Sequence, residues 1–208
     1  LEQVYPYQWI QGDYNGDGMT DVGIFRKRDG VWYFALSRGT VPDLMTCACN
    51  GIGGAYTFEY ANSTSMDNRG ADGLEHLPVN YRVCTAMTMG DGTGNSIVTR
   101  YTYSGGYAFS AFVNGYKETD YFGFSRFCII DALGGKTENT YNNVLYSDFR
   151  HNRALAGAIK CSRKTGTDAR EYGRTEYDYT IREITPPGFS KAAGFLVEPV
   201  ETRTYSKG

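Results

Sequence analysis

The sequence has 208 residues, enough for one large domain or two small ones, and a net charge of −2 at pH 7. Acidic and basic residues are mixed along the chain, which argues against a nucleic-acid partner and an anionic membrane surface. No apolar run approaches the roughly 20 residues that a membrane-spanning helix needs. The chain starts at Leu1 without a signal-peptide pattern, so we expect an excised fragment or a processed product.

The amino-acid composition favours an all-β fold. Tyr (18), Phe (11) and Gly (26) are abundant, whereas Pro is scarce (6). Aromatic residues separated by glycine-containing turns are typical of strands and hairpins. We therefore expect antiparallel hairpins and meander sheets with little helix.

The most specific motif is a loop at residues 12–25, in which oxygen-bearing side chains recur at alternate positions and a glycine stands where the loop reverses. Calcium binds six to eight oxygen atoms at about 2.3–2.6 Å, and alternate side chains of a tightly curled loop can converge on one ion. The predicted calcium ligands are the side chains of Asp13, Asn15, Asp17 and Asp21 and the backbone carbonyl of Met19.

The residues around this loop indicate strands rather than the helices of an EF-hand. An EF-hand loop ends in a bidentate Glu at its twelfth position, and that position is occupied by Ile24. The flanking residues Val22, Ile24 and Phe25 favour strands. The sequence therefore predicts a calcium loop at a strand junction, and the alternative is a metal-free turn of the Asn-Gly and Asp-Gly type.

The predicted strands alternate with turns along the rest of the chain. In the first unit, bulky residues on both faces of Val31–Ser37 indicate that this strand is buried. We expect residues 62–80 to form a polar surface loop or a flexible excursion, and the aromatic segment 107–141 to form core rather than a sugar-binding platform. The remaining predicted strands are Val22–Arg26, Leu44–Cys49, Ala55–Ala61, Tyr81–Met89, Ser96–Tyr103, Phe124–Asp131, Lys136–Tyr141, Glu176–Glu183 and Val200–Ser206.

The five cysteines exclude a fully paired disulfide framework within one chain, because their number is odd. Cys47 and Cys49 are two residues apart in a predicted strand, so their side chains point the same way. A zinc site would need a second pair of ligands at suitable spacing, and the sequence contains none. Buried free thiols are the favoured interpretation of the five cysteines.

The N-terminal unit resembles the FG-GAP/VCBS repeat of β-propellers. The resemblance rests on the loop from Asp13 to Asp21, followed by Gly30-Val31-Trp32. In that repeat a loop of this type binds calcium between two strands. One such unit cannot bury its own face, because repeats stack on one another. The resemblance implies a calcium-loop unit over residues 1–40, which is a blade or part of one.

Residues 44–141 are similar to the region that follows the FG-GAP segment in SpvB-like and Tc-toxin B-component proteins of the RHS/YD-repeat group. The resembling segments are Leu44–Tyr60, Val98–Gly106, Tyr121–Asp131 and Gly135–Tyr141. The resemblance implies a β-rich module over residues 41–208 of a large secreted or cell-surface toxin. In that family a propeller precedes a β-sheet shell, which encloses a C-terminal toxic domain.

The sequence contains no recognisable catalytic motif. It has two histidines, no Gly-x-Ser-x-Gly motif and no Glu-x-Glu pair of the kind found in the ADP-ribosyltransferase domain of SpvB-like proteins. The paired carboxylates Glu171 with Glu176 and Glu198 with Glu201 are better explained as exposed charges than as catalysts. We therefore expect a non-enzymatic, calcium-stabilised structural module, with the remainder of a larger toxin as its partner. The alternative is a binding module whose aromatic surface recognises a glycan or a host receptor.

Overall fold

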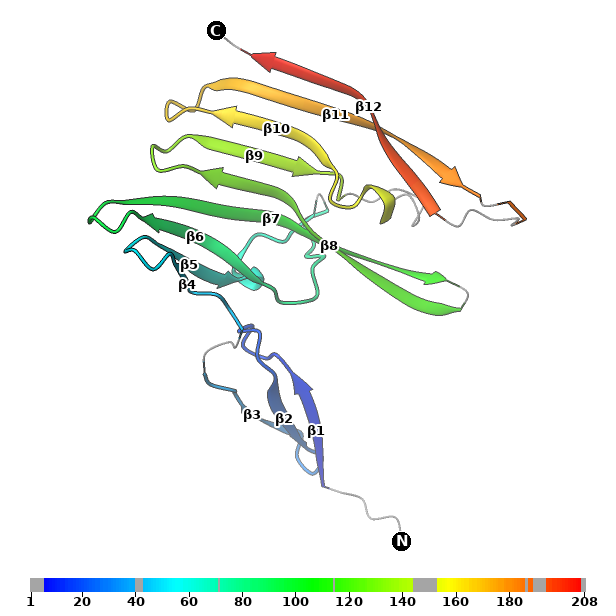
Figure 1. The fold of residues 1–208 in the computed structure, drawn as a ribbon. Coiled ribbons are helices and arrows are strands. Elements are labelled where there is room, and N and C mark those ends of the chain that lie inside the picture. Colours follow the sequence, from blue (N-terminus) through cyan, green and yellow to red (C-terminus); the bar gives the residue numbers. More distant parts are fainter. Residues whose placement is uncertain are drawn as a thin grey trace.

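The computed structural model describes residues 6–39, 43–70, 72–113, 115–143, 153–185, 187–188 and 194–206. The chain is all-β, as the composition predicts, and almost all of its regular structure consists of antiparallel strands. These strands form two separate sheets, a small one at the N-terminal end and a large one that contains the rest (Figure 1).

The small sheet contains three antiparallel strands in chain order: β1 (Tyr7–Gly12), β2 (Asp21–Arg26) and β3 (Val31–Ala35). Gly12 pairs with Asp21 at the end of the β1–β2 hairpin, so residues 13–20 form the loop between these two strands. The predicted calcium loop therefore connects two strands, as the β-forming residues around it indicate.

The large sheet contains nine strands, and each is hydrogen-bonded to the strand that precedes or follows it in the sequence. It is a continuous antiparallel meander in which β4 and β12 are the outer strands. Its strands are β4 (Cys47–Cys49), β5 (Ala55–Asn62), β6 (Arg82–Gly90), β7 (Ser96–Val113), β8 (Tyr116–Ile130), β9 (Lys136–Tyr141), β10 (Ile159–Thr165), β11 (Glu171–Ile184) and β12 (Gly194–Ser206).

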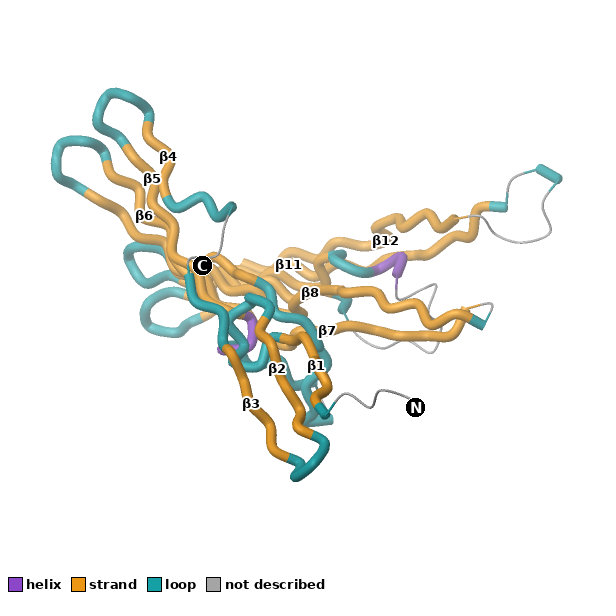
Figure 2. Tube along the Cα trace, turned by 90° about the horizontal axis from the view of Figure 1, so that it is seen from below, coloured by secondary structure: helices purple, strands orange, loops and turns teal. Residues whose placement is uncertain are grey.

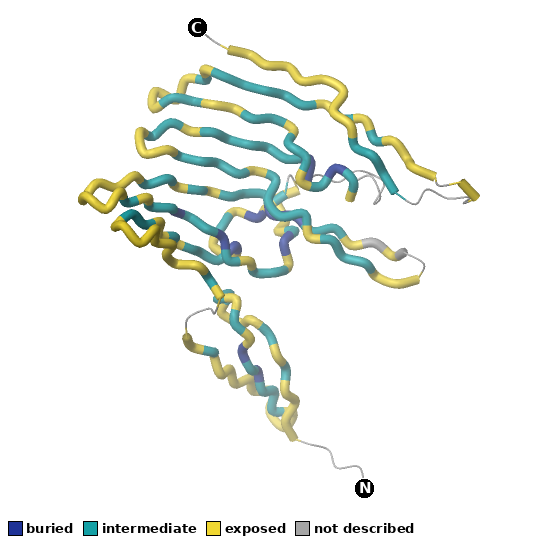
Figure 3. Tube along the Cα trace, viewed as in Figure 1, coloured by how far each residue is buried: buried dark blue, intermediate teal, exposed yellow. Residues whose placement is uncertain are grey.

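The large sheet is a twisted single layer, and no second sheet covers it among the described residues (Figure 2). Buried residues lie where the connection between β5 and β6 meets the sheet, and others lie on β2 and among the described residues between β9 and β10 (Figure 3). The fully or nearly buried apolar residues of the described chain are Leu77, Val83, Ala86, Tyr107 and Leu155. Most side chains on both faces are therefore only partly removed from water.

The connection between β5 and β6 begins with the short 3₁₀ helix η1 (Ser63–Ser65). Strand β7 pairs with β6 only as far as Arg100. Beyond that residue the connection takes the place of β6 along the edge of β7, through the bridges Asp67 to Ser104 and His76 to Tyr107. The segment was predicted to be a polar surface loop, but Ser63, Asn68 and Leu77 within it are buried. It is thus an ordered part of the sheet's packing.

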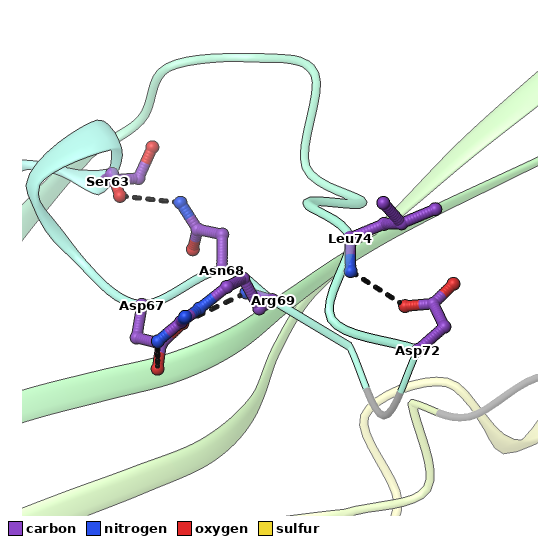
Figure 4. Close-up of polar contacts among 6 residues, drawn as sticks. All are labelled: Ser63, Asp67, Asn68, Arg69, Asp72 and Leu74. Carbon is purple, nitrogen blue, oxygen red and sulfur yellow. Dashed lines mark hydrogen bonds and ion pairs between the residues drawn. The ribbon is translucent and has the colours of Figure 1, made fainter.

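Side-chain hydrogen bonds within this connection fix its path (Figure 4). Asn68 donates its side-chain amide to the carbonyl oxygen of Ser63 at 2.8 Å. Arg69 Nε and Nη2 donate to the two carboxylate oxygens of Asp67 at 2.8 and 3.0 Å. Polar residues that indicated a loop in the sequence therefore satisfy one another locally, as Asn and Asp side chains do in turns.

Three hairpins at one end of the large sheet share the same five-residue turn. Each turn begins with an Asn or Asp whose Oδ1 accepts hydrogen bonds from the backbone N–H groups two and four residues later. These turns are Asn50–Gly54, Asp91–Asn95 and Asp131–Gly135. They recur about every 40 residues, which is a structural repeat of one hairpin.

Strand β3 differs from its prediction because all five of its residues are exposed, whereas we expected it to be buried. Bulk on both faces indicates burial only when both faces have a neighbouring layer, and β3 is an edge strand of a small sheet. Several other strands differ in length: β4 is shorter than predicted, and β7, β8 and β12 are longer.

Candidate metal centre

The loop between β1 and β2 is organised around the side chain of Asp13. Asp13 Oδ1 accepts a hydrogen bond from the backbone N–H of Asp17 at 3.0 Å, and Oδ2 accepts one from Gly18 at 2.8 Å. Burial acts to raise the pKa of Asp13, but the hydrogen bonds from Gly18, Asn80 and Asp17 outweigh it and hold the pKa below its ordinary value. The Asp13 carboxylate is thus kept charged.

The other two alternate side chains turn toward each other within the same ring of backbone. Asn15 Nδ2 donates to Asp17 Oδ2 at 2.9 Å, and Asp17 Oδ1 accepts from the N–H of Met19 at 2.8 Å. The Met19 carbonyl oxygen accepts no hydrogen bond from any described residue. The structure therefore brings Asp13, Asn15 and Asp17 into one curled loop.

Asp21 stands apart from these three side chains. It is fully buried, and its two oxygens accept hydrogen bonds from the backbone N–H groups of Tyr14 at 2.9 Å and Ser37 at 2.8 Å. It forms no ion pair with a described residue. A buried carboxylate is costly unless its oxygens are hydrogen-bonded, and these two backbone donors supply that hydrogen bonding for Asp21.

The conformation of the loop depends on glycine at position 18. Its φ of +83° lies in the left-handed region, where a side chain is strained. A Cβ at this position would lie 3.5 Å from Asn80 Nδ2. Glycine is therefore needed for the tight turn, whereas the distance to Asn80 would leave a Cβ in ordinary van der Waals contact.

The tip of the loop is held by residues of the large sheet. The carbonyl oxygen of Gly16 accepts hydrogen bonds from Asn62 Nδ2 at 2.7 Å, Asn80 Nδ2 at 2.7 Å and Thr64 Oγ1 at 3.0 Å. Sequence patterns gave no indication of these contacts, because the donors lie 46 to 64 residues further along the chain and belong to no recognisable motif.

Two further contacts come from the same region of the large sheet. Arg82 donates its Nη2 to the carbonyl oxygen of Asp17 at 2.5 Å, and Asn80 Nδ2 also approaches Asp13 Oδ2 at 3.3 Å. The donors all lie at one end of β5 and β6 or in the connection between them. The predicted metal loop is therefore also the point at which the small sheet is attached to the large one.

The donor set fits a hard cation, although the side chains are not fully arranged around one point. No group of three or more His, Cys, Asp or Glu side chains in the described ranges is arranged to hold a metal ion. The predicted ligands include only three carboxylates, and Asp21 is turned toward backbone N–H groups. The remaining oxygen atoms come from an amide and a backbone carbonyl, which calcium accepts.

Other carboxylates with shifted pKa values lie in a cleft between the β5–β6 connection and strands β7 to β10. The hydrogen bonds from Arg69 lower the pKa of Asp67 to about 2, and contact with His76 is the main cause that lowers the pKa of Asp72. Both shifts follow from local pairing. The paired carboxylates considered in the sequence likewise form ion pairs with arginines: Glu171, Glu176, Glu198 and Glu201.

Comparison with known families places this arrangement among toxin proteins. Residues 9–154 match the family described as the insecticide toxin TcdB middle/N-terminal region. The chain belongs to this family. The match to the TcdB region includes the metal loop, most of the small sheet and the large sheet as far as β9. No curated protein matches the chain.

Membership of the TcdB region confirms the resemblance to Tc toxins and indicates a part of a larger toxin polypeptide or complex. The FG-GAP and RHS/YD-repeat assignments and the domain boundary near residue 40 stay predictions; residues 40–42 are outside the described ranges. No helix in the described part of the chain is long and apolar enough to span a membrane.

Proposed function

We propose that the chain is a non-enzymatic, calcium-stabilised structural module of a secreted or cell-surface toxin. The observation that carries this proposal is the position of the metal loop. Its side chains are the predicted ligands, and its carbonyl oxygens at Gly16 and Asp17 accept hydrogen bonds from the large sheet. A calcium ion would fix the loop from inside while Asn80 and Arg82 hold it from outside.

The chemistry of the residues supports calcium as the cation. Asp13, Asn15 and Asp17 would supply side-chain oxygens, Met19 its backbone carbonyl oxygen, and Asp21 would bind directly or through water. Bound calcium would offset the negative charges of three aspartates in one short loop, including the buried Asp21. Its role in this proposal is to hold the strands and not to take part in a reaction.

The single-layer sheet supports a structural role within a larger polypeptide. A chain of 208 residues that folded alone would be expected to bury a substantial apolar core, whereas few apolar side chains are buried here. The faces of the large sheet and the outer edges of β4 and β12 are open among the described residues. In the proposal, neighbouring parts of the toxin cover these surfaces.

Thermal unfolding with calcium and with a chelator tests the proposal. Calcium at about 100 times its Kd would add roughly 2.7 kcal/mol to the free energy of unfolding, so the melting temperature should rise clearly in calcium. The same rise should be absent from the Asp17→Ala variant. An equal melting temperature of the wild-type chain in calcium and in chelator would contradict calcium stabilisation.

An exposed aromatic surface favours a second candidate, a binding module for a glycan or a host receptor. Trp9 is 68% exposed and Phe34 is 53% exposed in the small sheet, and the Trp32 and Phe34 rings are stacked with centroids 6.0 Å apart. Exposed aromatic patches of this kind mark interaction sites. Binding to a glycan array that Trp32→Ala abolishes would support this candidate, and an array without signal would argue against the glycan.

A further inference from the structure

The outer strand β4 carries two cysteines whose sulfur atoms are in contact. Cys47 Sγ and Cys49 Sγ lie 3.2 Å apart, and both residues are exposed. Their side chains point the same way, as the spacing of two residues in a strand predicts. The expectation that the cysteines are buried is wrong for this pair. The other three cysteines lie on separate strands and are half-buried.

The contact between these sulfurs sets them apart from ordinary surface thiols. The hydrogen bond with Cys49 is the main cause that raises the pKa of Cys47 above its ordinary value. Burial raises the pKa of Cys128 and Cys161 as well, and these half-buried thiols are also less accessible to a dissolved disulfide. Exposure and proximity together make Cys47 and Cys49 the pair that a dissolved disulfide would reach first.

Strand geometry indicates that a disulfide between them would be strained and reversible. Residues two apart in a strand have Cα atoms about 6.4–6.8 Å apart, which is near the upper limit of the 4.4–6.8 Å range for disulfides. A bond at this upper limit is strained unless the strand contracts toward the usual separation, and strained disulfides are more easily reduced. Strand β4 can contract because it has only three residues and pairs on one side.

We propose that Cys47 and Cys49 form a redox-active dithiol that exchanges with small-molecule disulfides of the glutathione type. One cysteine thiolate attacks a sulfur of the glutathione disulfide, which forms a mixed disulfide and releases one glutathione. The second cysteine then attacks the protein sulfur of the mixed disulfide and releases the other glutathione. The two protein thiols lose two electrons and two protons in total, and the glutathione disulfide is reduced to two thiols.

Closure of this disulfide would change the attachment of the outer strand. Cys47 is paired with Thr57 and Cys49 with Ala55 on β5, so contraction between the cysteines disturbs both ends of this short ladder. Tyr60 also holds this region through its hydroxyl, which donates to the carbonyl oxygen of Met45 at 2.9 Å. Oxidation is therefore expected to loosen β4 from β5, and reduction to restore the ladder.

Mass spectrometry of the full chain in glutathione buffers tests the dithiol. Cleavage after Arg and Lys yields the peptide 39–69, which contains Cys47 and Cys49 and no other cysteine. After acid quenching and alkylation, the peptide from oxidising buffer should carry no alkyl group and should be two hydrogens lighter than the unmodified dithiol peptide. Treatment with dithiothreitol before alkylation should restore two alkylated thiols. Hydrogen exchange should be faster in the oxidised chain at Phe58, whose backbone N–H donates to the carbonyl oxygen of Thr46 across the β4–β5 ladder at 3.0 Å.

The single variants Cys47→Ser and Cys49→Ser supply the matched control. Each should stop at the mixed disulfide and carry one glutathione on peptide 39–69, because the second thiol is missing. The double variant Cys128→Ser with Cys161→Ser should still form the internal disulfide. The proposal is overturned if the wild-type peptide stays doubly alkylated in oxidising buffer, carries two glutathiones, or pairs between two chains.

Discussion

Asn80, in the connection between β5 and β6 of the large sheet, donates its side-chain amide to the carbonyl oxygen of Gly16 in the metal loop at 2.7 Å, across 64 residues of sequence. This contact joins the two sheets of the molecule. A three-stranded sheet with few buried side chains has little stability of its own, and the described small sheet buries Asp21 and Gly23 but no large apolar residue. Its order therefore depends on the loop that attaches it.

The Asn80→Ala substitution should weaken this attachment. It removes the donor to Gly16 and to Asp13, and also the acceptor for Ser63 Oγ at 3.3 Å. The expected loss is about 1–2 kcal/mol, since Gly16 keeps two other donors. Hydrogen exchange in strands β1 to β3 should become faster while exchange in β8 to β11 stays unchanged. Asn95→Ala, which removes an amide from an exposed turn, is the matched control and should leave the small sheet protected.

Gly92→Ala should destabilise the large sheet more than Gly94→Ala. Both glycines have positive φ, +80° and +105°, so both alanines are strained. Only at position 92 would the new Cβ lie 2.6 Å from a backbone atom, the carbonyl carbon of Gly53, whereas position 94 faces open space. The difference in free energy of unfolding should be on the order of 1–3 kcal/mol by urea denaturation. Equal losses would show that the two turns are not in contact.

Turns and short strands are the parts of this fold that the sequence predicts best. Strand β9 has the predicted bounds Lys136–Tyr141, since the glycine turn before it defines where it begins. The Asn/Asp turns at residues 50, 91 and 131 form a repeat that was present in the sequence and could have been recognised from the recurring Asn/Asp and Gly residues.

The candidate site was only partly predictable for a physical reason. The spacing of Asp13, Asn15 and Asp17 is local, and the structure does curl these residues into one loop. The contacts of Asn80 and Arg82 with the loop are not local, and neither residue belongs to a motif. The exposure of β3 was also unpredictable, because burial depends on whether another layer is present.

Tyr103→Phe should lower stability and remove a late-titrating phenol. The Tyr103 hydroxyl donates to the carbonyl oxygen of Cys84 at 2.7 Å, and its ring lies 5.1 Å from the rings of Phe124 and Phe127. The substitution leaves the carbonyl without this donor, which should cost about 1 kcal/mol. Thermal unfolding at neutral pH measures this loss, and an unchanged melting temperature would contradict the hydrogen bond.

The same tyrosine predicts the response to alkaline pH. Burial raises the pKa of Tyr103 from 10.0 to about 12. The neutral phenol is thus favoured in the folded state, so its contribution to stability is complete below pH 10 and is lost as the pH rises from 10 through 12. Ultraviolet titration should show one fewer phenol ionising above about pH 11 in Tyr103→Phe than in the wild-type chain.

Asp67 predicts a corresponding loss in acid. Hydrogen bonds from Arg69 lower the pKa of Asp67 from 3.8 to about 2. Because the folded pKa lies below the unfolded one, the contribution is complete above pH 3.8 and disappears as the pH falls through 2. Asp67→Asn should therefore flatten the dependence of the melting temperature on pH in this interval. A slope identical to that of the wild-type chain would rule out the Asp67–Arg69 pair as its cause.

Calorimetric titration of calcium into the full chain tests most directly whether the loop that joins the two sheets is a metal site. We predict binding of one ion to the wild-type chain, loss of that binding in Asp17→Ala, and unchanged binding in Asp91→Ala. The control is closely matched, because Asp91 also precedes a glycine and accepts backbone hydrogen bonds in a turn. Absence of binding to the wild-type chain, or equal binding to Asp17→Ala, would contradict a calcium-stabilised junction.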